Sequence, residues 1–335
     1  MRGSGVIYRG LTLITQAMVK NIRIGLIGNG SWGRNYLDSA KNILGMEIID
    51  ITNEIKKSFN KGNIYRTLKD FYHNKNISGF ILATLPVVQT KILYEILSIK
   101  APVICEKPLC LYYEDLMYLK EKVQPNHIIF LNHFHLFLET FSFVEKNIHD
   151  EEISKICVQD GNCGPFRKDT PSFLDWGVHA VGIVLRLINK APIKIKYNEV
   201  EQSKIVGSKA YVYSLKFRFG DGRNCTVIFG NGFSNKKRTI KVFLKNQIKP
   251  IVFLGNNISG VIKHKYADFT NLQNKRTPLE NLLIDFRECI QKNKTDPKNS
   301  FNLGTRALET LLRIKQEQKD KKHTVSSKYI CIDLE

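Results

Sequence analysis

Residues 22–33 read IRIGLIGNGSWG, and this stretch decides the fold that we expect for the first half of the chain. Residues 22–27 are an apolar run that ends at a glycine, which is typical of a buried strand. Three glycines follow at the spacing G-x-G-x-x-G, and SWGRNYLDSAKNIL (31–44) then predicts a helix. A glycine-rich turn between a first strand and a first helix is the setting that the dinucleotide-binding fingerprint requires.

Each of the three glycines meets a physical need of such a site. Gly28 permits the tight turn, Gly30 lets the backbone approach a pyrophosphate, and Gly33 lets the helix pack close to the strand. Amide groups at the helix N-terminus then bind anionic phosphates. A glycine-rich turn that binds nothing is the alternative, and the place of the motif favours the cofactor. The predicted ligands of NAD or NADP in this motif are Gly28, Asn29, Gly30, Ser31, Trp32 and Gly33.

Strands and helices alternate through the first half of the chain. Further strands are expected at 46–53, 79–86, 101–108 and 127–132, with helices at 67–74, 87–99 and 111–123. This alternation indicates βαβ units and a Rossmann-type, doubly wound parallel sheet. We therefore expect a dinucleotide-binding domain over residues 19–132. Residues 1–18 are expected to be an extension, either disordered or the product of an upstream start.

The pattern changes in the second half, residues 133–335, where we expect an α+β domain. The segment YVYSLKFRF (211–219) alternates aromatic and apolar residues with polar ones, and GDG and NCTVIFG follow. Such a pattern predicts an antiparallel hairpin with one face in contact with water. Helices are expected at 174–188, 278–291 and 303–316. The fold class is therefore α/β, with a second, largely antiparallel and open-faced sheet.

Charge and cysteine content narrow the class of protein. The chain has 335 residues, a formal net charge of +20 and a sequence pI of about 9.6, which suits either an anionic partner or a solvated basic surface. Without an RNA-binding signature, zinc-finger spacing or arginine-rich tract, we expect no nucleic-acid partner. No apolar run approaches the ~20 residues of a membrane span. The seven cysteines are scattered and form no C-x-x-C pair, which favours free thiols in a reducing cytoplasm.

The residue expected to contact the cofactor ribose departs from the dinucleotide-binding fingerprint. An acidic residue is expected about 20 positions after the glycines. Asn53 stands there, with Glu54 beside it and Asp50 earlier in the strand. Asn53 can bind a ribose hydroxyl but excludes a 2′-phosphate less strongly than a carboxylate does, and Lys56 and Lys57 lie close by in the sequence. The choice between NAD and NADP therefore stays open.

Three further segments carry candidate chemistry. ATLP (83–86) and EKP (106–108) end neighbouring strands, at the edge where parallel sheets bind ligands. The Lys107 ammonium is suited to stabilise an alkoxide as hydride leaves, although a surface ion pair with Glu106 is the alternative. Asp175 and His179 are four residues apart on one helical face, and a histidine titrates near neutrality. A packed structural histidine is the alternative there.

Taken in order, these motifs resemble the Gfo/Idh/MocA oxidoreductase family, which includes glucose–fructose oxidoreductase and inositol dehydrogenase. IGLIGNGSWGRNYL resembles the opening of that family, ATLP its ATPP element, VICEKPL its vlvEKPl motif, LDWGVHAVGIVLRLI its D-x-G-x-H helix and PLENLLIDFRECI its C-terminal pattern. The resemblance covers nearly the whole chain from residue 19.

The resemblance implies hydride transfer between a nicotinamide cofactor and a hydroxyl-bearing carbon of a sugar or nucleotide-sugar. Lys107 would contact substrate and nicotinamide, His179 would take the hydroxyl proton, and Asp175 would orient His179 or the substrate. The resemblance further implies cofactor contacts from Asn53, Thr84, Leu85, Pro86, Gln89, Glu106, Lys107 and Asn132. The second half would bind substrate and form the oligomer, so that a homodimer or homotetramer is expected.

One segment suggests a subgroup, and several departures support an alternative. NCGPFRKDTPSFLDWG (162–177) resembles family members of surface-polysaccharide biosynthesis, in which Arg167 would meet a phosphate or a sugar carboxylate; a basic loop is the alternative. Gln89 stands where the family often has His, and Ala180 where related sequences often have Asp. Together with Asn53 these departures motivate a non-catalytic nucleotide- or sugar-sensing protein on the same fold. His133 and His135 lack a third ligand at usable spacing, so no metal is expected.

Overall fold

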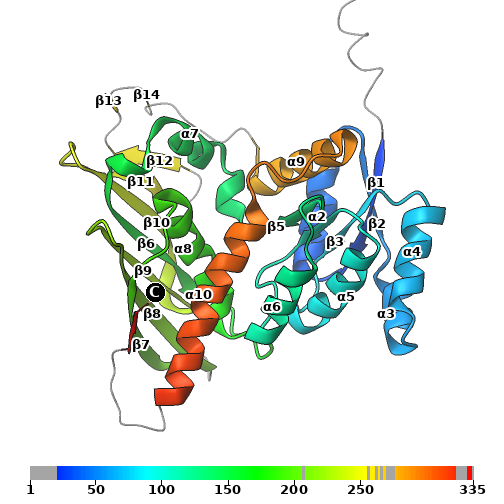
Figure 1. Ribbon diagram of the computed structural model, residues 1–335, viewed down its shortest axis with the longest axis horizontal. Coiled ribbons are helices and arrows are strands. Elements are labelled where there is room, and N and C mark those ends of the chain that lie inside the picture. Colours follow the sequence, from blue (N-terminus) through cyan, green and yellow to red (C-terminus); the bar gives the residue numbers. More distant parts are fainter. Residues whose placement is uncertain are drawn as a thin grey trace, which may run out of the picture.

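Two β-sheets with helices between them make up the protein (Figure 1). The computed structural model describes residues 21–205, 208–254, 257–260, 263–264, 267–268, 276–321 and 330–333. The extension expected at residues 1–18 lies outside the described residues. The expected fold class, a parallel doubly wound sheet followed by a mostly antiparallel one, is confirmed.

The first sheet is parallel and has the strand order β2-β1-β3-β4-β5. Its strands are β1 (Ile22–Ile27), β2 (Met46–Asp50), β3 (Gly79–Leu82), β4 (Val103–Cys105) and β5 (Ile129–Leu131). The helices that connect them are α2 (Ser31–Ala40), α3 (Thr52–Asn60), α4 (Ile64–Asn74), α5 (Pro86–Ser98) and α6 (Tyr113–Lys122). Every residue of β3, β4 and β5 is buried, because helices cover a parallel sheet on both faces and its strands read as continuous apolar runs.

The strands are shorter than the sequence predicts, and this places the motifs. The strand expected at 79–86 ends at Leu82, and the one expected at 101–108 ends at Cys105. ATLP and EKP therefore lie in the loops beyond the carboxyl ends of β3 and β4. The strand expected at 46–53 ends at Asp50 and gives way to helix α3, which we did not predict. The signal for α3 was Ile55 and Phe59, an apolar pair four residues apart on one helical face.

The second sheet has eight strands in the order β12-β11-β10-β6-β9-β8-β7-β15, and β6 with β9 is its parallel pair. The strands are β6 (Ile153–Cys163), β7 (Lys194–Ile205), β8 (Ser208–Arg218), β9 (Asn224–Gly230), β10 (Gly232–Leu244), β11 (Ile251–Leu254), β12 (Asn257–Gly260) and β15 (Ile330–Asp333). A separate two-stranded ladder joins β13 (Lys263–His264) and β14 (Ala267–Asp268).

Helices lie between the two sheets, as Figure 1 shows. They are α8 (Ser172–Ile188) and α10 (Ser300–Lys321). The second half also contains α7 (Glu139–Asn147), the 3₁₀ turns η1 (Phe134–Phe137) and η2 (Asp150–Glu152), and α9 (Pro278–Lys292), which packs on α2 and η1. Helix α8 packs on strands β6 and β9, and α10 packs on α8. In the described part of the chain the opposite face of the second sheet carries no helix (Figure 1). This is the face expected to form an oligomer, which stays a prediction.

The alternation predicted for β8 is confirmed and sets the inner face of the second sheet. Tyr213, Leu215 and Phe217 are at most 5% exposed, whereas Lys216 and Arg218 between and after them are exposed. Because successive side chains of a strand point to opposite faces, the aromatic row packs toward α8. There Phe173 of α8 lies 5.0 Å from Tyr213 between ring centroids.

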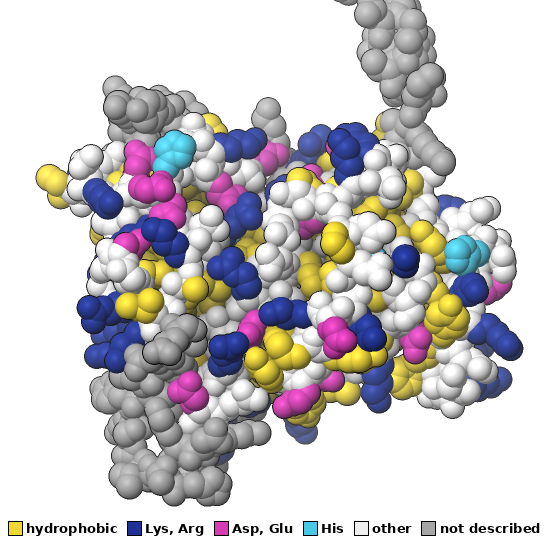
Figure 2. All heavy atoms as spheres, in the orientation of Figure 1, with side chains coloured by type: hydrophobic (Ala, Val, Ile, Leu, Met, Phe, Trp, Pro, Cys, Tyr) yellow, Lys and Arg dark blue, Asp and Glu magenta, His cyan; other side chains and the backbone are white. Residues whose placement is uncertain are grey.

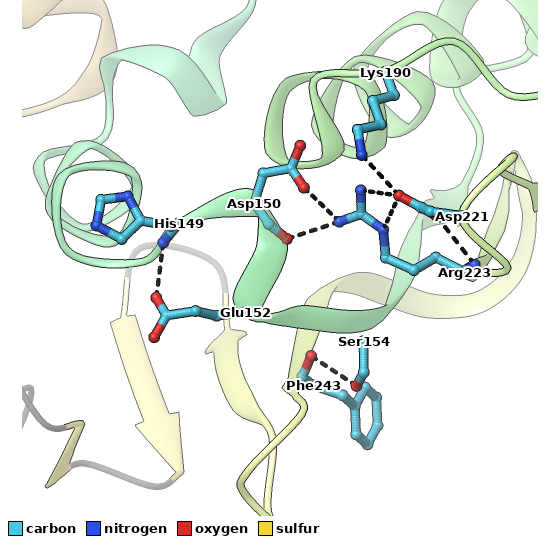
Figure 3. Close-up of polar contacts among 8 residues, drawn as sticks. All are labelled: His149, Asp150, Glu152, Ser154, Lys190, Asp221, Arg223 and Phe243. Atoms are coloured by element: carbon cyan, nitrogen blue, oxygen red, sulfur yellow. Dashed lines mark hydrogen bonds and ion pairs between the residues drawn. The ribbon is translucent and has the colours of Figure 1, made fainter.

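A buried arginine holds the far end of the second sheet together (Figure 3). Arg223, in the turn from β8 to β9, donates to the backbone carbonyl and the carboxylate of Asp150 in η2, at 2.7 and 2.6 Å. It also donates to the Asp221 carboxylate, which Lys190 contacts at 3.0 Å after α8. These contacts tie one hairpin turn to two neighbouring segments.

The basic charge of the chain is spread over its surface. Figure 2 shows lysine and arginine side chains scattered over the visible face of both halves, with acidic side chains among them. That face therefore presents no single basic stripe of the kind that tracks a nucleic-acid backbone. Among the described residues, no helix is long and apolar enough to cross a membrane.

Candidate functional site

A cavity of about 560 Å³ lies at the carboxyl edge of the first sheet. This volume is within the ordinary range for cofactor and small-molecule sites. The lining residues that matter here are Gly28, Asn29, Gly30, Ser31, Trp32, Thr52, Lys56, Thr84, Leu85, Pro86, Glu106, Lys107, Arg167 and Asp175. Segments after β1, β2, β3 and β4 thus converge on one space, which is the place where open α/β sheets bind ligands.

The glycines of the first turn differ in what surrounds them. A Cβ on Gly28, whose φ is +110°, would lie 2.4 Å from the carbonyl oxygen of Ala83, and one on Gly33 would lie 1.9 Å from that of Gly28. Both positions therefore require glycine to let β1, β3 and α2 approach one another. A Cβ on Gly30 would meet nothing within 4 Å, and Gly30 lines the cavity. Gly30 is thus free to face a ligand.

The N-terminus of α2 faces the same space. Gly30 is its N-cap, no side chain caps it, and its first turn contains no acidic residue. Its first amide groups are therefore available to an anion, and the helix dipole favours negative charge there. Across the cavity, the buried hydroxyl of Thr84 has no hydrogen-bond partner. An open glycine, an uncapped helix and an orphaned hydroxyl fit the pyrophosphate and ribose of a dinucleotide.

The loop after β4 is held by two buried side chains. Glu106 is 6% exposed and accepts hydrogen bonds from Tyr36 of α2 and Asn132 after β5, both at 2.8 Å. Burial raises the pKa of Glu106, and these two hydrogen bonds oppose the rise. Gln89, 1% exposed, donates to the carbonyl of Glu106 at 2.6 Å and accepts from its amide at 3.1 Å. These contacts fix the position of Lys107.

Four residues expected at the cofactor do not line this cavity, namely Gly33, Asn53, Gln89 and Asn132. Gly33 packs against Gly28, and Asn132 lines a second cavity. Gln89 lies behind the loop after β4, where it acts on Glu106. Asn53 is exposed on α3, and its neighbours Thr52 and Lys56 line the cavity instead. Thr52 accepts a hydrogen bond from the Gly28 amide at 2.9 Å, and its own amide donates to Asp50 at 2.9 Å. The carboxylate at the end of β2 is thus Asp50, three residues before the position that we predicted.

A second cavity, of about 490 Å³, lies between the first sheet and the inner face of the second. Its lining includes Trp32, Asn35, Glu106, Lys107, Asn132, Phe134, Asp160, Arg167, Asp175, Trp176, His179 and Arg238. Trp32, Glu106, Lys107, Arg167 and Asp175 line both cavities. The two spaces therefore meet at these residues, so that molecules held in them would be in contact.

Lys107 lies at this junction and is oriented by helix α8. Its ammonium donates to the side-chain Oδ1 and to the backbone carbonyl of Asp175, both at 2.7 Å. The other carboxylate oxygen of Asp175 lies 3.3 Å from Nε of Arg167. Lys107 and Asp175 have side chains only 13% and 9% exposed, so that water screens the pair weakly. Asp175 thus orients Lys107 and Arg167 rather than His179, whose Nδ1 has no hydrogen-bond partner.

His179 lies one turn further along α8, as the spacing predicts, and lines the second cavity. It is 7% exposed. Burial lowers its pKa well below the ordinary value, and the positive charge of Lys107 lowers it further. The imidazole is therefore neutral near pH 7, which is the form that accepts a proton.

His133 and His135 are packed rather than placed on one face of a strand. Strand β5 ends at Leu131, and His135 lies in the turn η1. His133 fits against two helices that have glycine at the contact, since a Cβ on Gly182 or on Gly304 would come within 2.9 Å of its ring. Among the described residues, no three histidine, cysteine or acidic side chains are grouped so that they could hold a metal.

Several side chains that line the second cavity were not predicted from the sequence, among them Trp176, Asp160 and Arg238. Trp176 lies beside Asp175 on α8, and its indole nitrogen has no partner. Asp160 of β6 and Arg238 of β10 are directly paired across the sheet. The alternation of both strands carried a signal, because each strand has a charged residue on the same face as its buried apolar residues. These are Ile156 and Val158 on β6 and Ile240 and Val242 on β10.

Comparisons with known proteins support the fold. No protein-family model matches the sequence, and no curated protein matches it. Myo-inositol 2-dehydrogenase from Lactobacillus plantarum superposes with a TM-score of 0.70 at 16% identity, over 94% of this chain and 100% of the other. UDP-N-acetylglucosamine 3-dehydrogenase from Acidithiobacillus ferrooxidans gives 0.69 at 14%, over 88% and 97%. A levoglucosan dehydrogenase with NADH and levoglucosan gives 0.68 at 14%, over 90% and 98%.

TM-scores of this size over nearly the whole of both chains establish a shared fold, so the fold implied by the sequence resemblance is confirmed. Identities this low show the fold alone. The chemistry has to be argued from the residues of this chain.

Proposed function

We propose that this protein is a nicotinamide-dependent oxidoreductase of the Gfo/Idh/MocA type that acts on a hydroxyl group of a sugar or nucleotide-sugar. The observation that carries the proposal is the junction of the two cavities. A partly buried Lys107 held by Asp175 lies where they meet, and the neutral His179 lines the second one. One cavity suits a dinucleotide and the other a small polar substrate, with the reacting groups between them.

When bound, a nicotinamide dinucleotide supplies the acceptor for a hydride, the hydrogen and both electrons of a broken C–H bond. Lys107 binds the substrate hydroxyl through its ammonium and stabilises the charge that develops on the oxygen. His179 accepts the hydroxyl proton as the carbonyl forms, and returns a proton when the reaction runs in reverse. Asp175 holds Lys107 in place, so that little reorganisation is needed during the step.

The second cavity favours a sugar or a sugar derivative as substrate. Trp32 and Trp176 give it two aromatic walls, and Lys107, Asp160, Arg167 and Arg238 give it charged groups. Apolar ring faces with hydroxyl edges match such a lining. Arg167 is 38% exposed and lines both cavities, which supports its proposed contact with a phosphate or a carboxylate on the substrate.

The choice between NAD and NADP rests on two residues of opposite charge. Lys56 lines the cavity from α3 and would attract a 2′-phosphate. Asp50 ends β2 and would repel one, although one of its oxygens is bound by the Thr52 amide. We include both dinucleotides in the proposal, because these charges oppose each other.

A non-catalytic sensor on the same fold is the second candidate. The departures at Gln89, Asn53 and Ala180 motivated it, and none of these residues lines the cofactor cavity. The residues required for chemistry, Lys107 and His179, are present and buried around the second cavity. The oxidoreductase is therefore favoured.

A turnover screen with a matched variant tests the proposal. Protein, NAD or NADP and each of myo-inositol, levoglucosan and UDP-N-acetylglucosamine would be followed by the absorbance of the reduced nicotinamide. We expect turnover with a member of this chemical class, and its loss in Lys107→Met with dinucleotide affinity unchanged. Lys100→Met is the control, since Lys100 lies at the opposite end of β4. Full activity of Lys107→Met, or dinucleotide binding without turnover of any sugar or nucleotide-sugar, would contradict the catalytic assignment.

A further inference from the structure

A paired acid and arginine on the second sheet form a feature that the proposed mechanism does not use. Asp160 is 1% exposed, and neither of its carboxylate oxygens accepts a hydrogen bond. Nε of Arg238 lies 3.8 Å from Oδ1 and has no hydrogen-bond partner of its own. A buried, unsatisfied carboxylate costs stability, so its presence calls for an explanation.

Packing does not explain the pair. On the inner face of β6, Ile156 and Val158 precede Asp160, and both are buried against α8. On the inner face of β10, Ile240 and Val242 follow Arg238. An apolar residue at either position would continue the core, and replacing a buried ion pair by apolar residues is often neutral or stabilising.

The position of the pair points instead to a ligand. Asp160 and Arg238 line the second cavity together with Lys107 and His179. The Arg238 guanidinium lies 4.6 Å from the ring centroid of Phe134, which holds it at the cavity wall, and Phe134 in turn lies 4.9 Å from the His179 ring. The cavity therefore has a reacting side, at Lys107 and His179, and a second polar side on the sheet.

Resting on the proposed function, we propose that Asp160 and Arg238 bind hydroxyl groups of the substrate other than the one that reacts. The carboxylate accepts hydrogen bonds from hydroxyl groups, and the guanidinium donates to their oxygens. Neighbouring hydroxyls on a sugar ring donate and accept at once, so that one diol satisfies both side chains. By fixing the ring on the sheet, the pair determines which carbon faces Lys107, and it selects polyols over simple alcohols.

Tryptophan fluorescence gives a readout that is independent of turnover. The chain contains two tryptophans, and Trp32 and Trp176 both line this cavity. Dinucleotide affinity is measured first. The protein, saturated with whichever reduced dinucleotide binds, is then titrated with myo-inositol, levoglucosan and UDP-N-acetylglucosamine. The reduced form cannot oxidise these probes.

Asp160→Asn should lower the affinity for the tightest-binding probe by about 10- to 100-fold, the range for a hydrogen bond to a charged group. Its dinucleotide affinity should be unchanged, and its thermal midpoint should not fall, because the Asp160 carboxylate has no hydrogen bond to lose and the Arg238 side chain, 35% exposed, keeps access to water. Asp160→Glu should bind the probe better than Asp160→Asn, because it keeps the charge. A purely structural role predicts the reverse order, since Glu overfills a buried site and Asn does not.

The matched controls are Gln159→Ala and Thr239→Ala, an adjacent pair in register across the same two strands. They should bind the probe as the wild type does. The proposal is overturned if Asp160→Asn binds the probe as tightly as the controls do, or if Asp160→Asn binds it more tightly than Asp160→Glu does. It is also overturned if no probe binds to the dinucleotide-saturated wild type. A protein that binds no dinucleotide would instead contradict the proposed function, and the same titration of the protein alone would still test the pair.

Discussion

The two cavities differ in how the chain builds them. The first is made mainly of loops and helix starts that directly follow strands, so most of its parts are motifs continuous in the sequence; Arg167 and Asp175 join it from the second half of the chain. The second is made of single side chains from β6, α8, β10 and the loops after β4 and β5. A phosphate-binding site can therefore be recognised from a short segment of sequence, because it uses backbone amides and glycines. A substrate-binding site cannot, because it uses buried side chains whose partners are far apart in the sequence.

The largest expected effect is confined to the second cavity. His179→Gln removes the proton acceptor, and turnover should fall by about 10²- to 10⁴-fold. Dinucleotide affinity should stay within twofold, because His179 does not line the first cavity. Steady-state rates and calorimetry measure the two properties. His73→Gln, an exposed histidine on α4, serves as the control. A comparable loss of dinucleotide affinity would show that the cavities are not separable in this way.

Next in size is a change that breaks the framework of the first cavity. Gly33→Ala places a Cβ 1.9 Å from the Gly28 carbonyl oxygen, so α2 has to move away from β1. Overpacking of this kind costs about 3 kcal/mol of the free energy of unfolding. Urea denaturation measures it. A variant as stable as the wild type would mean that α2 approaches β1 less closely than described.

Gly30→Ala tests the same glycine turn, but it should change dinucleotide affinity without changing stability. Its Cβ would enter open space, so the free energy of unfolding should change by less than about 1 kcal/mol. The methyl group would, however, lie where the pyrophosphate is expected, and dinucleotide affinity should fall about 10-fold or more. Calorimetry on Gly30→Ala and the wild type tests this. Unchanged affinity would remove Gly30 from the binding surface.

Acidification should act on the region around the second cavity. Burial lowers the pKa of His133 to about 3 and those of His135 and His179 well below the ordinary value of about 6.5. These histidines stay neutral when folded and take up protons when unfolded, so stability is complete above pH ~6.5 and falls as the pH decreases below it. Each of these histidines should lower the free energy of unfolding by about 1 kcal/mol between pH ~7.5 and pH ~5.5.

Two carboxyl groups have the opposite effect on stability when the pH decreases. Burial raises the pKa of Asp160 to about 6 and that of Glu106 above its usual range, so that both gain protons in the folded state on acidification. Elsewhere in the chain, burial likewise lowers the pKa of His127 and raises that of Asp296, and these two changes oppose each other. The histidines therefore outnumber the carboxyl groups, and we expect a net loss of stability on acidification. Urea denaturation at pH values of about 7.5 and 5.5 measures it. Equal or greater stability at the lower pH would mean that the histidines are not buried in the neutral form.

The smallest expected effect concerns cofactor choice in the first cavity. Lys56→Gln removes the cation that lines the α3 side, so the ratio of NADPH to NADH affinity should fall about threefold, as for a partly exposed ion pair. Lys57→Gln, on the same helix but outside the cavity lining, should leave the ratio unchanged. An equal effect of both substitutions would indicate a general charge effect instead.

The sequence predicted most of the first cavity and about half of the second. The glycine turn, ATLP, EKP, Asp175 and His179 follow from local patterns, and the structure brings them together. Asn53 was misplaced because the strand was extended over the start of α3. Gln89 was assigned to the cofactor because a linear motif cannot show that a side chain points behind its loop.

Asp160 and Arg238 were missed for a physical reason. A single charged residue within an alternating strand is common at a surface, and sequence alone does not show that this part of the two strands faces the cavity between the sheets. Only the register of β6 and β10 reveals that the two residues form a pair.

Calorimetric titration of the purified protein with NAD, NADH, NADP and NADPH tests the central claim most directly. We expect saturable binding of one dinucleotide pair at one site per chain, with weaker binding in Gly30→Ala. If none of the four binds to protein that has been shown to carry no dinucleotide from purification, the first cavity is not a cofactor site. In that case the lysine and histidine at its junction with the second cavity are not a redox centre.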